Sequence, residues 1–320
     1  MNNSNLVACI TINYNHAKDT INCVNSLLES DYSNFIIFLI DNGSHIDDYR
    51  ILSEFTSNAI IIRLLRIEKN VGYVGGVNYG LTEAAKINPD YYLIMNNDTV
   101  IDKHAIKALV DTSIDFSNNC IVSGKVYNMD NPSSLQYIGQ WERNANKLDF
   151  PPYIKNSKEI DNGQYEQKME VAMLDDIYWL IPAIVLNKIG LYSDYFYLYG
   201  EQNDYALRAK KNGVKLIYTP LAKLWHHHHL TTGGNKQKEL AISYWRMYSS
   251  LTILYLHFSR KAFYTFYFKQ FFRSLVKSIL FMGDREKREN SKYKLLACWY
   301  FSKWMFNKKP NLGFNPYAKN

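Results

Sequence analysis

The sequence predicts an α/β protein with a mostly parallel β-sheet, helices on both faces of that sheet and a C-terminal helical extension. Two observations predict the sheet. Apolar runs of strand length alternate with segments in which apolar residues recur at helical spacing. These runs are continuously apolar, as in strands buried on both faces. A third observation predicts the extension: residues 255–320 contain 14 Lys and Arg against 3 acidic residues.

Composition divides the chain into two regions. Of 320 residues, 47% are hydrophobic, which is enough for a sizeable core and excludes global disorder. The net charge of +7 is uneven, because residues 255–320 carry +11 and the rest of the chain carries −4. We therefore predict a domain over 1–230 and a basic, aromatic helical region over 231–320.

The expected elements follow in chain order. Strands are expected at 6–15, 35–44, 59–70, 91–95, 120–128 and 214–220. Helices are expected at 17–30, 45–56, after the glycine-rich turn at 70–80, at 103–116 and at 200–213. Residues 128–170 break the pattern and predict an irregular loop with a short hairpin. Regular patterning returns at 171–190.

Polar side chains follow two of the apolar runs directly. The run from 35 ends on "IDNGS", which contains Asp41, and the run from 91 ends on Asn96, Asn97 and Asp98. In open α/β sheets, ligands bind at the carboxyl ends of the strands. Asp41 is therefore expected to accept hydrogen bonds from a nucleobase or ribose. The alternative is that Asp41 begins a turn, since Asp-Asn-Gly is favourable turn chemistry.

The Asn96–Asp98 cluster has a specific chemical use. A diphosphate-bearing ligand needs an oxygen-ligated Mg²⁺ or Mn²⁺, for which one or two carboxylates, phosphate oxygens and waters suffice. Asp98 is expected to bind that metal, and Asn96 to bind a ribose hydroxyl. The alternative is a polar strand end before a helix that Thr99 or Asp102 caps.

The segment "NVGYVGGVNYG" (70–80) contains Gly72, Gly75, Gly76 and Gly80. It matches neither GxGxxG nor a P-loop. Its glycines permit a tight turn and a close backbone approach, and the helix that follows offers its N-terminus to an anion. A structural turn is the alternative interpretation.

Two more sites carry titratable groups. Glu201 and Asp204 are three residues apart on one helix face near its N-terminus, where a general base is a reasonable role. An ion pair between Asp204 and Arg208 is the alternative. His226, within "WHHHH", is a candidate ligand for a metal or donor to a phosphate, against an exposed loop without a role.

Taken in order, several segments resemble the family 2 inverting glycosyltransferases, particularly the rhamnosyltransferase-like branch that builds bacterial surface polysaccharides. The matching segments cover roughly residues 6–230 and are "ITINYN", "IDNGS", "NVGYVGGVNYG", "MNNDT", "YLYGEQNDYALRAKKNG" and "YTPLAKLWH". The resemblance implies a GT-A fold, which has a Rossmann-like sheet. It also implies transfer of a sugar from a UDP- or dTDP-sugar to a saccharide, free or polyprenyl-linked.

The resemblance also implies roles for individual residues. Asp98 and His226 would bind Mg²⁺ or Mn²⁺, with Asn96 in place of the first acid of the family's DxD motif. Asp175, Asp176 and Trp179 would lie on the acceptor side. The donor-binding residues implied are Thr11, Asn13, Tyr14, Asn15, Asp41, Asn70, Gly72, Gly76, Asn78, Asn96 and Asn97.

Gln202 departs from the family pattern, which often reads Glu-Asp-x-Asp where this chain has Glu201-Gln202-Asn203-Asp204. Glutamine cannot accept a proton at neutral pH, so Glu201 or Asp204 is expected to act as the base. The alternative is a catalytically silent binding or assembly subunit. A nucleotidyltransferase would need a basic phosphate-binding turn after the first strand, where only His16 and Lys18 occur.

The C-terminal region is expected to contact a membrane surface. Lys269, Arg273 and Lys277 recur every four residues on a helix otherwise rich in Phe, Tyr, Leu and Ile. These cations argue against a membrane span and favour a helix lying in the interface. The alternative is packing on the domain or on a second subunit, as in a homodimer, and no nucleic-acid motif occurs. With no signal peptide and four scattered cysteines, we predict a cytoplasmic protein on the inner face of a bacterial membrane.

Overall fold

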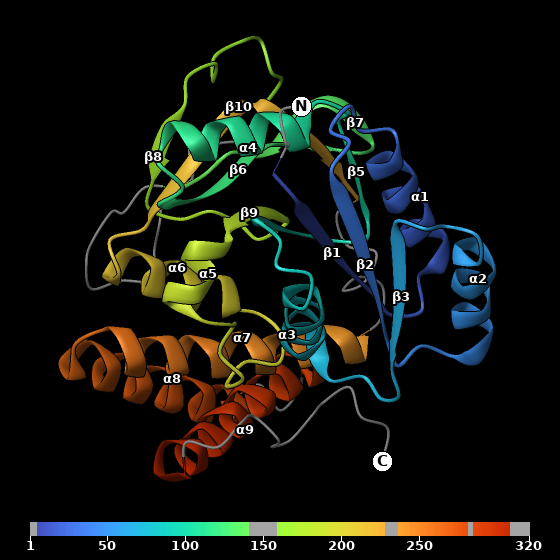
Figure 1. Ribbon diagram of the computed structural model, residues 1–320. Coiled ribbons are helices and arrows are strands. Elements are labelled where there is room, and N and C mark those ends of the chain that lie inside the picture. The colour runs from blue at the N-terminus through green and yellow to red at the C-terminus, as the bar shows by residue number, and fades with distance from the viewer. Residues whose placement is uncertain (1–4, 141–158, 228–235, 281–283, 308–320) are drawn as a thin grey trace. The chain divides into compact units, whose positions relative to one another are not determined.

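The computed structural model describes residues 5–140, 159–227, 236–280 and 284–307 (Figure 1). These residues form two compact units. The first contains the described residues up to Tyr192 and those from Tyr205 to 227. The second contains Ser193–Asp204 and the described residues after 235. The predicted boundary at 230 therefore differs in one respect, because Ser193–Asp204, with Glu201 and Asp204, groups with the C-terminal helices.

The first unit is built on a ten-stranded sheet. Eight of its strands follow the order β3-β2-β1-β4-β9-β6-β10-β5, and the other two, β7 and β8, pair with β6 and β10 respectively. Strands β3, β2, β1 and β4 are mutually parallel, whereas β9 pairs antiparallel with β4. The strands are β1 (Val7–Asn13), β2 (Phe35–Asn42), β3 (Ile62–Ile67), β4 (Tyr91–Met95), β5 (Thr99–Ile101), β6 (Cys120–Asn128), β7 (Asn131–Tyr137), β8 (Met169–Val171), β9 (Tyr178–Pro182) and β10 (Lys215–His226). The predicted α/β sheet, mixed and mostly parallel, is confirmed.

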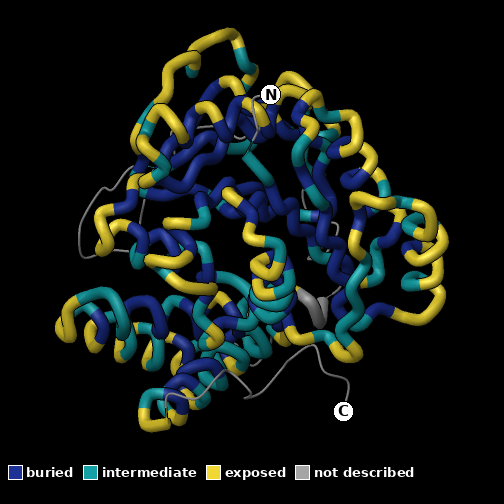
Figure 2. The backbone as a smooth tube through the Cα atoms, viewed as in Figure 1, coloured by how far each residue is buried: buried dark blue, intermediate teal, exposed yellow. Residues whose placement is uncertain are grey.

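Helices cover both faces of this sheet, as predicted (Figure 1). The helices are α1 (Ala17–Leu28), α2 (Ile46–Thr56), α3 (Gly72–Ala85), α4 (Ala105–Asp115), α5 (Ala183–Ile189) and α6 (Glu201–Lys211), which begins in the second unit. Side chains alternate along a strand, so Cys9 and Leu39 pack with α1, α2 and α4 in one cluster. Ile10 and Ile40 face α3 on the other side. Figure 2 shows the resulting buried sheet.

The glycines of α3 allow this helix to lie unusually close to the sheet. A Cβ at Gly80 would lie 2.6 Å from Ile10 Cγ2, and one at Gly76 would lie 3.0 Å from Ile12 Cγ2. Gly72, at φ +80°, makes the turn into the helix. The close backbone approach predicted for this segment is therefore an approach to strands β1 and β2.

The predicted short hairpin after residue 128 is confirmed, because β6 and β7 pair antiparallel. The rest of the predicted irregular loop lies partly in 141–158, outside the described residues. All four cysteines are buried free thiols. Burial raises the pKa of Cys23 to about 12, so this thiol stays protonated and acts as a small apolar group.

The second unit contains α7 (Lys236–His257), α8 (Arg260–Leu280) and α9 (Arg285–Asn307). Its core is aromatic: Tyr248 and Phe301 pack edge to face at 6.3 Å, and Tyr197 stacks on Trp245 at 4.8 Å. The predicted helical, aromatic extension is confirmed. Among the described residues, no helix has the length and apolar character needed to cross a bilayer.

Candidate active site

The polar ends of β1, β2 and β4 meet at the carboxyl edge of the sheet. Asn13 lies beside Asp41 in the β1–β2 register, and Thr11 lies beside Met95 in the β1–β4 register. Parallel strands end at the same edge, so Asp41 and the residues after Met95 are brought together as the sequence predicts. Asp41 belongs to β2 and is fully buried, while the turn is made by Gly43 at φ +73°.

Asn13 is the centre of a buried hydrogen-bond network at this edge. Its Nδ2 lies 3.1 Å from Asp41 Oδ1, 3.0 Å from Ser44 Oγ and 2.8 Å from Asp48 Oδ2. Its Oδ1 accepts a hydrogen bond from Thr20 Oγ1 at 2.8 Å. Both ends of this fully buried amide are therefore used inside the protein. The structure makes Asn13 a positioning residue for Asp41 rather than an exposed ligand contact.

The network extends to β4 through one further bond. Asn97 Nδ2 donates to Thr20 Oγ1 at 2.8 Å, so the end of β4 is tied through Thr20 to Asn13. Asn97 is consequently turned inward, with 8% of its surface exposed. Asn96 is half-buried, and its carbonyl accepts a hydrogen bond from Thr99 Oγ1 at 2.6 Å.

Asp41 has one carboxylate oxygen left over. Asp41 Oδ2 is buried and has no hydrogen-bond partner among the described residues, and the same holds for Arg66 Nη1, 3.7 Å away. Arg66 Nη2 donates to Ser44 O at 3.1 Å, and the guanidinium lies 4.2 Å from the Tyr49 ring centroid. Buried polar atoms are normally satisfied, so this pair is suited to a ligand that carries both a donor and an acceptor.

Asp98 and His226 form the second feature of the edge. Asp98 Oδ1 lies 3.2 Å from His226 Nε2, and both side chains are largely buried. Strand β10 brings His226 there by pairing antiparallel with β5, where His226 lies beside Thr99. The capping alternative does not hold for α4, which has no side-chain cap; Asp102 Oδ1 instead accepts a hydrogen bond from His104 N at 2.9 Å in the turn before the helix.

Gln136 of β7 orients the imidazole of His226. Its side-chain amide lies within hydrogen-bond distance of Nδ1, with Oε1 at 3.2 Å and Nε2 at 3.0 Å. When Gln136 presents Oε1, Nδ1–H donates to it and Nε2 keeps a lone pair on the side of Asp98. Asp175 lies close enough that His226 lowers its pKa, although burial dominates and raises it.

Asp98 and His226 are suited to supply the protein ligands of a divalent metal ion. Among the described residues, no group of three or more His, Cys, Asp or Glu side chains is placed to bind a metal. Asp98 supplies an oxygen and His226 a nitrogen, and both sit at one point of the edge. Mg²⁺ and Mn²⁺ commonly use one or two protein groups with phosphate oxygens and waters. The donor set is therefore compatible with a metal that a diphosphate ligand completes.

The other implied donor residues divide into exposed and internal positions. Tyr14 is the exposed one, with 41% of its surface accessible just after β1. Asn15 Oδ1 accepts a hydrogen bond from His45 N at 2.8 Å, and Asn70 Oδ1 accepts one from Gly72 N at 2.8 Å. Asn78 bonds through both ends of its amide to the backbone of Tyr192. Thr11 is buried within β1.

The implied acceptor residues also lie largely inside the first unit. Trp179 is fully buried in β9, where it stacks with Tyr192 at 6.3 Å. Asp176 is buried and Asp175 is half-buried in the segment before β9. For Trp179, this placement favours a packing role over the implied contact with an acceptor.

Glu201 and Asp204 lie in the first turn of α6, and both are buried. Asp204 Oδ1 lies 2.6 Å from Nε2 of His257, the last residue of α7. Gly200 precedes the helix at φ +87°, where a Cβ would lie 2.7 Å from Ser249 Cβ. Arg208 donates to the carbonyls of Ile189 and Leu191. Asp204 is thus committed to a buried partner.

The sequence did not predict several residues that contact the candidate site residues. These are Thr20, Ser44, Asp48, Arg66, Gln136 and His257. Ser44 follows Asp41 within "IDNGS", so its position at the strand end was available as a signal. Gln136 and His257 carry no such signal, since they reach His226 and Asp204 across 90 and 53 residues of sequence.

A mostly parallel α/β sheet with these polar groups at its carboxyl edge is a GT-A-like domain. The sequence pattern described as glycosyl transferase family 2 matches residues 8–172, just over half of the chain, and the chain belongs to this family. It is similar to "Glycosyltransferase GlyG" of Streptococcus pneumoniae serotype 4 (strain ATCC BAA-334 / TIGR4). The two are 22% identical over 233 residues, which cover 65% of this chain and 74% of the other.

A solved structure shows the same fold. It is described as "Crystal structure of GalNAc-T7 with UDP, GalNAc and Mn2+", and it superposes with a TM-score of 0.61 at 13% identity. The match covers 98% of this chain and 59% of that one, so the present chain spans about three-fifths of its length. At this identity the likeness establishes the fold alone.

The Asn13 network predicts a large loss of stability for Asn13→Ala. The substitution removes the shared partner of Asp41, Ser44 and Thr20, and leaving such buried groups unsatisfied costs about 3 kcal/mol in total. Urea unfolding of the whole protein measures this change. The control is Asn25→Ala, an exposed position of α1, which should change the free energy of unfolding by about 0.5 kcal/mol or less. Equal effects at both positions would contradict the network's role.

The Asp204–His257 pair predicts a second, separate loss. His257→Ala removes the partner of a buried carboxylate, for which a cost of about 3 kcal/mol is expected. The matched control is His104→Ala, because His104 pairs with Asp31 on the surface, where such pairs contribute about 1 kcal/mol or less. Denaturant midpoints of the two variants give the comparison. A His257 variant as stable as the His104 variant would show that the buried pair contributes little.

Proposed function

We propose that this protein transfers a sugar from a nucleoside-diphosphate donor, a UDP- or dTDP-sugar, with inversion at the anomeric carbon. The acceptor is a saccharide, free or polyprenyl-linked, and the product belongs to a bacterial surface polysaccharide. The pairing of Asp98 with His226, on the edge that also holds Asp41, carries this proposal. Family membership supports the reaction class. The rhamnosyltransferase-like segments support the choice of branch.

Three residues at the carboxyl edge would bind the donor. Asp41 Oδ2 would accept a hydrogen bond from the nucleoside, and Arg66 Nη1 would donate one beside it. Tyr14 offers an exposed ring at the end of β1, on which a base can stack. The Asn13 network holds Asp41 in place before the donor arrives, which lowers the cost of binding.

Asp98 and His226 would hold the metal. A Mg²⁺ or Mn²⁺ ion held there would supply positive charge to the departing nucleoside diphosphate. Gln136 fixes the imidazole of His226 in one orientation, and hydrogen bonds of this kind typically raise the affinity of a ligand for its metal.

Glu201 is the proposed general base. Its carboxylate takes the proton of the acceptor hydroxyl, whose oxygen attacks the anomeric carbon on the face opposite the diphosphate. The new carbon–oxygen bond forms as the bond to the diphosphate oxygen breaks, so the configuration inverts. We choose Glu201 over Asp204 because Asp204 is bound by His257 at 2.6 Å. Asp204 is better suited to hold the start of α6 in place.

The glutamine at position 202, where the family often has an acid, favours a second candidate function. Without the acid that the family often places at this position, the chain would act as a binding or assembly subunit that keeps the fold and lacks transfer. The two candidates share donor binding and differ in turnover, so separate measurements of each distinguish them.

Donor binding is predicted to be specific, metal-dependent and dependent on Asp98. Calorimetry with UDP, dTDP and GDP, each with and without Mn²⁺, should identify one preferred nucleotide. In the presence of Mn²⁺, Asp98→Ala should weaken its binding by about tenfold or more, because the metal loses its carboxylate. Asp111→Ala, an exposed acid of α4, is the control and should bind normally. If no nucleotide bound under any condition, the assembly-subunit function would be favoured instead.

Transfer is predicted to depend on Glu201 more than on Asp204. With the preferred donor and a screened acceptor, Glu201→Gln should lower kcat by about 10²–10⁴-fold, the usual contribution of a general base. Donor affinity should be unchanged. Asp204→Asn keeps a hydrogen-bonding group beside His257 and should lower kcat by a smaller factor. A larger loss in the Asp204 variant would assign the base to Asp204.

A further inference from the structure

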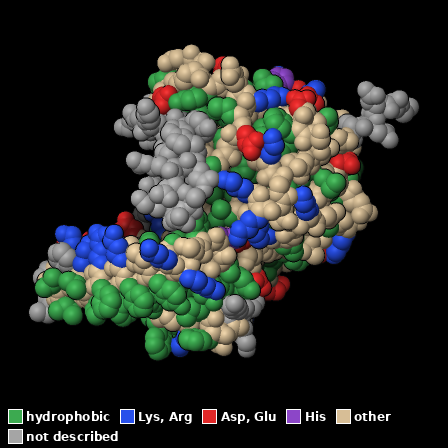
Figure 3. Space-filling view, turned by 90° about the vertical axis from the view of Figure 1, so that its left-hand side faces the viewer, with side chains coloured by type: hydrophobic (Ala, Val, Ile, Leu, Met, Phe, Trp, Pro, Cys, Tyr) green, Lys and Arg blue, Asp and Glu red, His purple; other side chains and the backbone are tan. Residues whose placement is uncertain are grey.

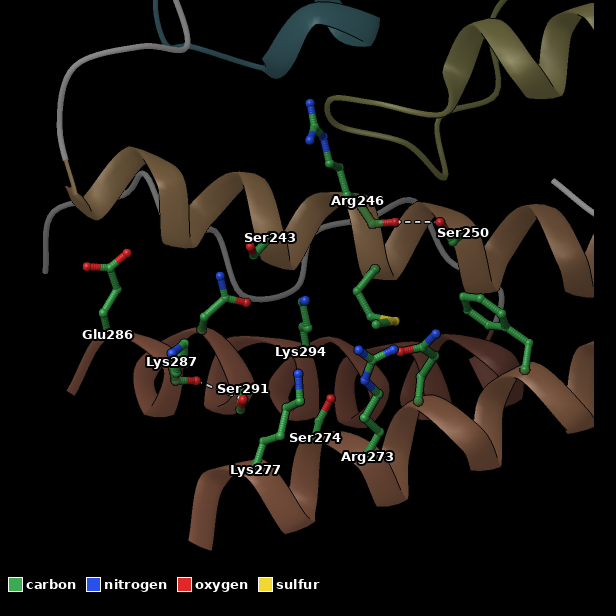
Figure 4. A pocket seen from close by; sticks show the side chains of 14 residues that line it. Ser243, Arg246, Ser250, Arg273, Ser274, Lys277, Glu286, Lys287, Ser291 and Lys294 are labelled. Atoms are coloured by element: carbon green, nitrogen blue, oxygen red, sulfur yellow. Dashed lines mark hydrogen bonds between the residues drawn. The ribbon is translucent and has the colours of Figure 1, made fainter. Parts of the chain in front are cut away.

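The helical unit contains a cavity of about 570 Å³ between α7, α8 and α9 (Figure 4). We call it the cationic cavity, because five basic side chains and one acidic side chain, Glu286, line it. The basic residues are Arg246, Arg273, Lys277, Lys287 and Lys294. Serine hydroxyls and side-chain amides make up most of the remaining lining, with Met247 and Phe266 as its apolar members.

Four of these five cations have no anionic partner among the described residues, and one of the four, Arg246, lies over the ring of Tyr199. Arg273, Lys277 and Lys294 have no ion pair among the described residues, whereas Lys287 pairs with Asp284 at 3.1 Å. Burial lowers the pKa of Lys294, and the positive charges of Lys277 and Arg273 lower it further. The three groups are therefore close enough to repel one another. An anion placed among them would relieve that repulsion and gain charge-assisted hydrogen bonds.

The outer face of α8 is apolar, which is unusual for a helix on a protein surface. Seven large side chains are exposed at three- and four-residue spacings, which places them on one face of the helix. We call this set the apolar stripe: Tyr264, Phe268, Phe272, Leu275, Val276, Ile279 and Leu280. Figure 3 shows hydrophobic side chains in a row along the helical unit, with Lys and Arg side chains beside them. Contiguous exposed apolar surface of this kind marks an interaction site.

The stripe and the cavity share one helix. Arg273 and Lys277 line the cavity, and together with Lys269 they form a basic row that borders the apolar stripe on α8. A bilayer presents phosphate groups directly beside hydrocarbon, which matches both features at once. A second copy of the same surface would instead bring its own cations against these cations. Charge complementarity therefore favours a bilayer over self-association.

We propose that the helical unit docks on an anionic phospholipid bilayer, with the apolar stripe of α8 in the interface and a lipid phosphate in the cationic cavity. Arg273 suits the phosphate because a guanidinium donates two parallel hydrogen bonds, and the two lysines add point charges. This site is separate from the sugar-transfer chemistry and goes beyond it. Resting on the proposed function, it would also bring the protein to a polyprenyl-linked acceptor, although no helix among the described residues could span a membrane.

Vesicle flotation of the full chain tests the proposal. Wild-type protein should float with vesicles of phosphatidylcholine and phosphatidylglycerol, much less with phosphatidylcholine alone, and less as salt rises. The triple variant Arg273→Gln, Lys277→Gln, Lys294→Gln should partition about a hundredfold less, at roughly fivefold for each cation. The control is Arg50→Gln, Lys107→Gln, Lys215→Gln, which removes the same charge from exposed positions of the first unit. This control variant should lose much less vesicle binding than the cavity variant.

The stripe is tested in the same assay. Phe268→Gln, Phe272→Gln, Ile279→Gln should reduce binding to both kinds of vesicle, while Ile46→Gln, Ile60→Gln, Ile184→Gln, at exposed apolar positions of the first unit, should not. Circular dichroism and nucleotide binding confirm that each variant is folded. Flotation requires neither nucleotide binding nor sugar transfer, so this test is independent of the proposed transferase function.

Three results would overturn the docking proposal. The first is no flotation of wild-type protein with any vesicle. The second is equal loss in the cavity variant and its charge-matched control. The third is a wild-type dimer, seen by sedimentation and lost in the stripe variant, that does not bind vesicles, which would make the stripe a self-association surface. Binding of inorganic phosphate by calorimetry without vesicle binding would likewise assign the cavity to a free anion.

Discussion

One buried amide sets the geometry of the carboxyl edge. Asn13 ties β1 to Asp41 of β2 directly and to Asn97 after β4 through Thr20. Buried polar groups are costly unless they are satisfied, so these side chains have few alternative positions once the strands are paired. Asp41 is therefore held with its other oxygen, Oδ2, 3.7 Å from Arg66 Nη1 and without a hydrogen bond among the described residues. Asn13 thus organises this edge without itself needing to touch a ligand.

The Asp98–His226 pair depends on a different constraint, the register of β10 against β5. His226 lies beside Thr99 in that register, and His227 N donates to Asp98 O at 2.9 Å. A shift of one residue would turn His226 to the other face of the sheet and remove its imidazole from Asp98. The hairpin that supplies Gln136 adds a second restraint on the same ring. The position of His226 beside Asp98 is thus a product of the pairing of β10 with β5 and of the β6–β7 hairpin.

These two constraints explain which parts of the structure the sequence could predict. Apolar runs and helical spacing are local, so the parallel strands, the helices around them and the edge positions of Asp41 and Asp98 were predictable. The insertion of β9 between β4 and β6 was not, because antiparallel pairing there joins distant segments. The internal role of Asn13 was not predictable either. The sequence does not show whether an amide at a strand end binds a ligand or a neighbouring side chain. For the same reason the family resemblance implied a donor-binding role for Gly76, whereas a Cβ at Gly76 would lie 3.0 Å from Ile12 Cγ2 of β1.

The two units differ in the charged groups that they offer to a ligand, so they are suited to different ligands. In the first unit, the carboxylate of Asp41 and the guanidinium of Arg66 lie 3.7 Å apart with one atom each unused among the described residues, which suits a neutral donor–acceptor edge such as a nucleobase or ribose. In the second unit, Arg273, Lys277 and Lys294 offer positive charge alone, which suits a phosphate. A nucleotide sugar brings both chemistries, but its phosphates can be met at the first unit by a metal on Asp98 and His226. The cations of the second unit are therefore available for a different anion, and the apolar stripe beside them favours one at a membrane surface.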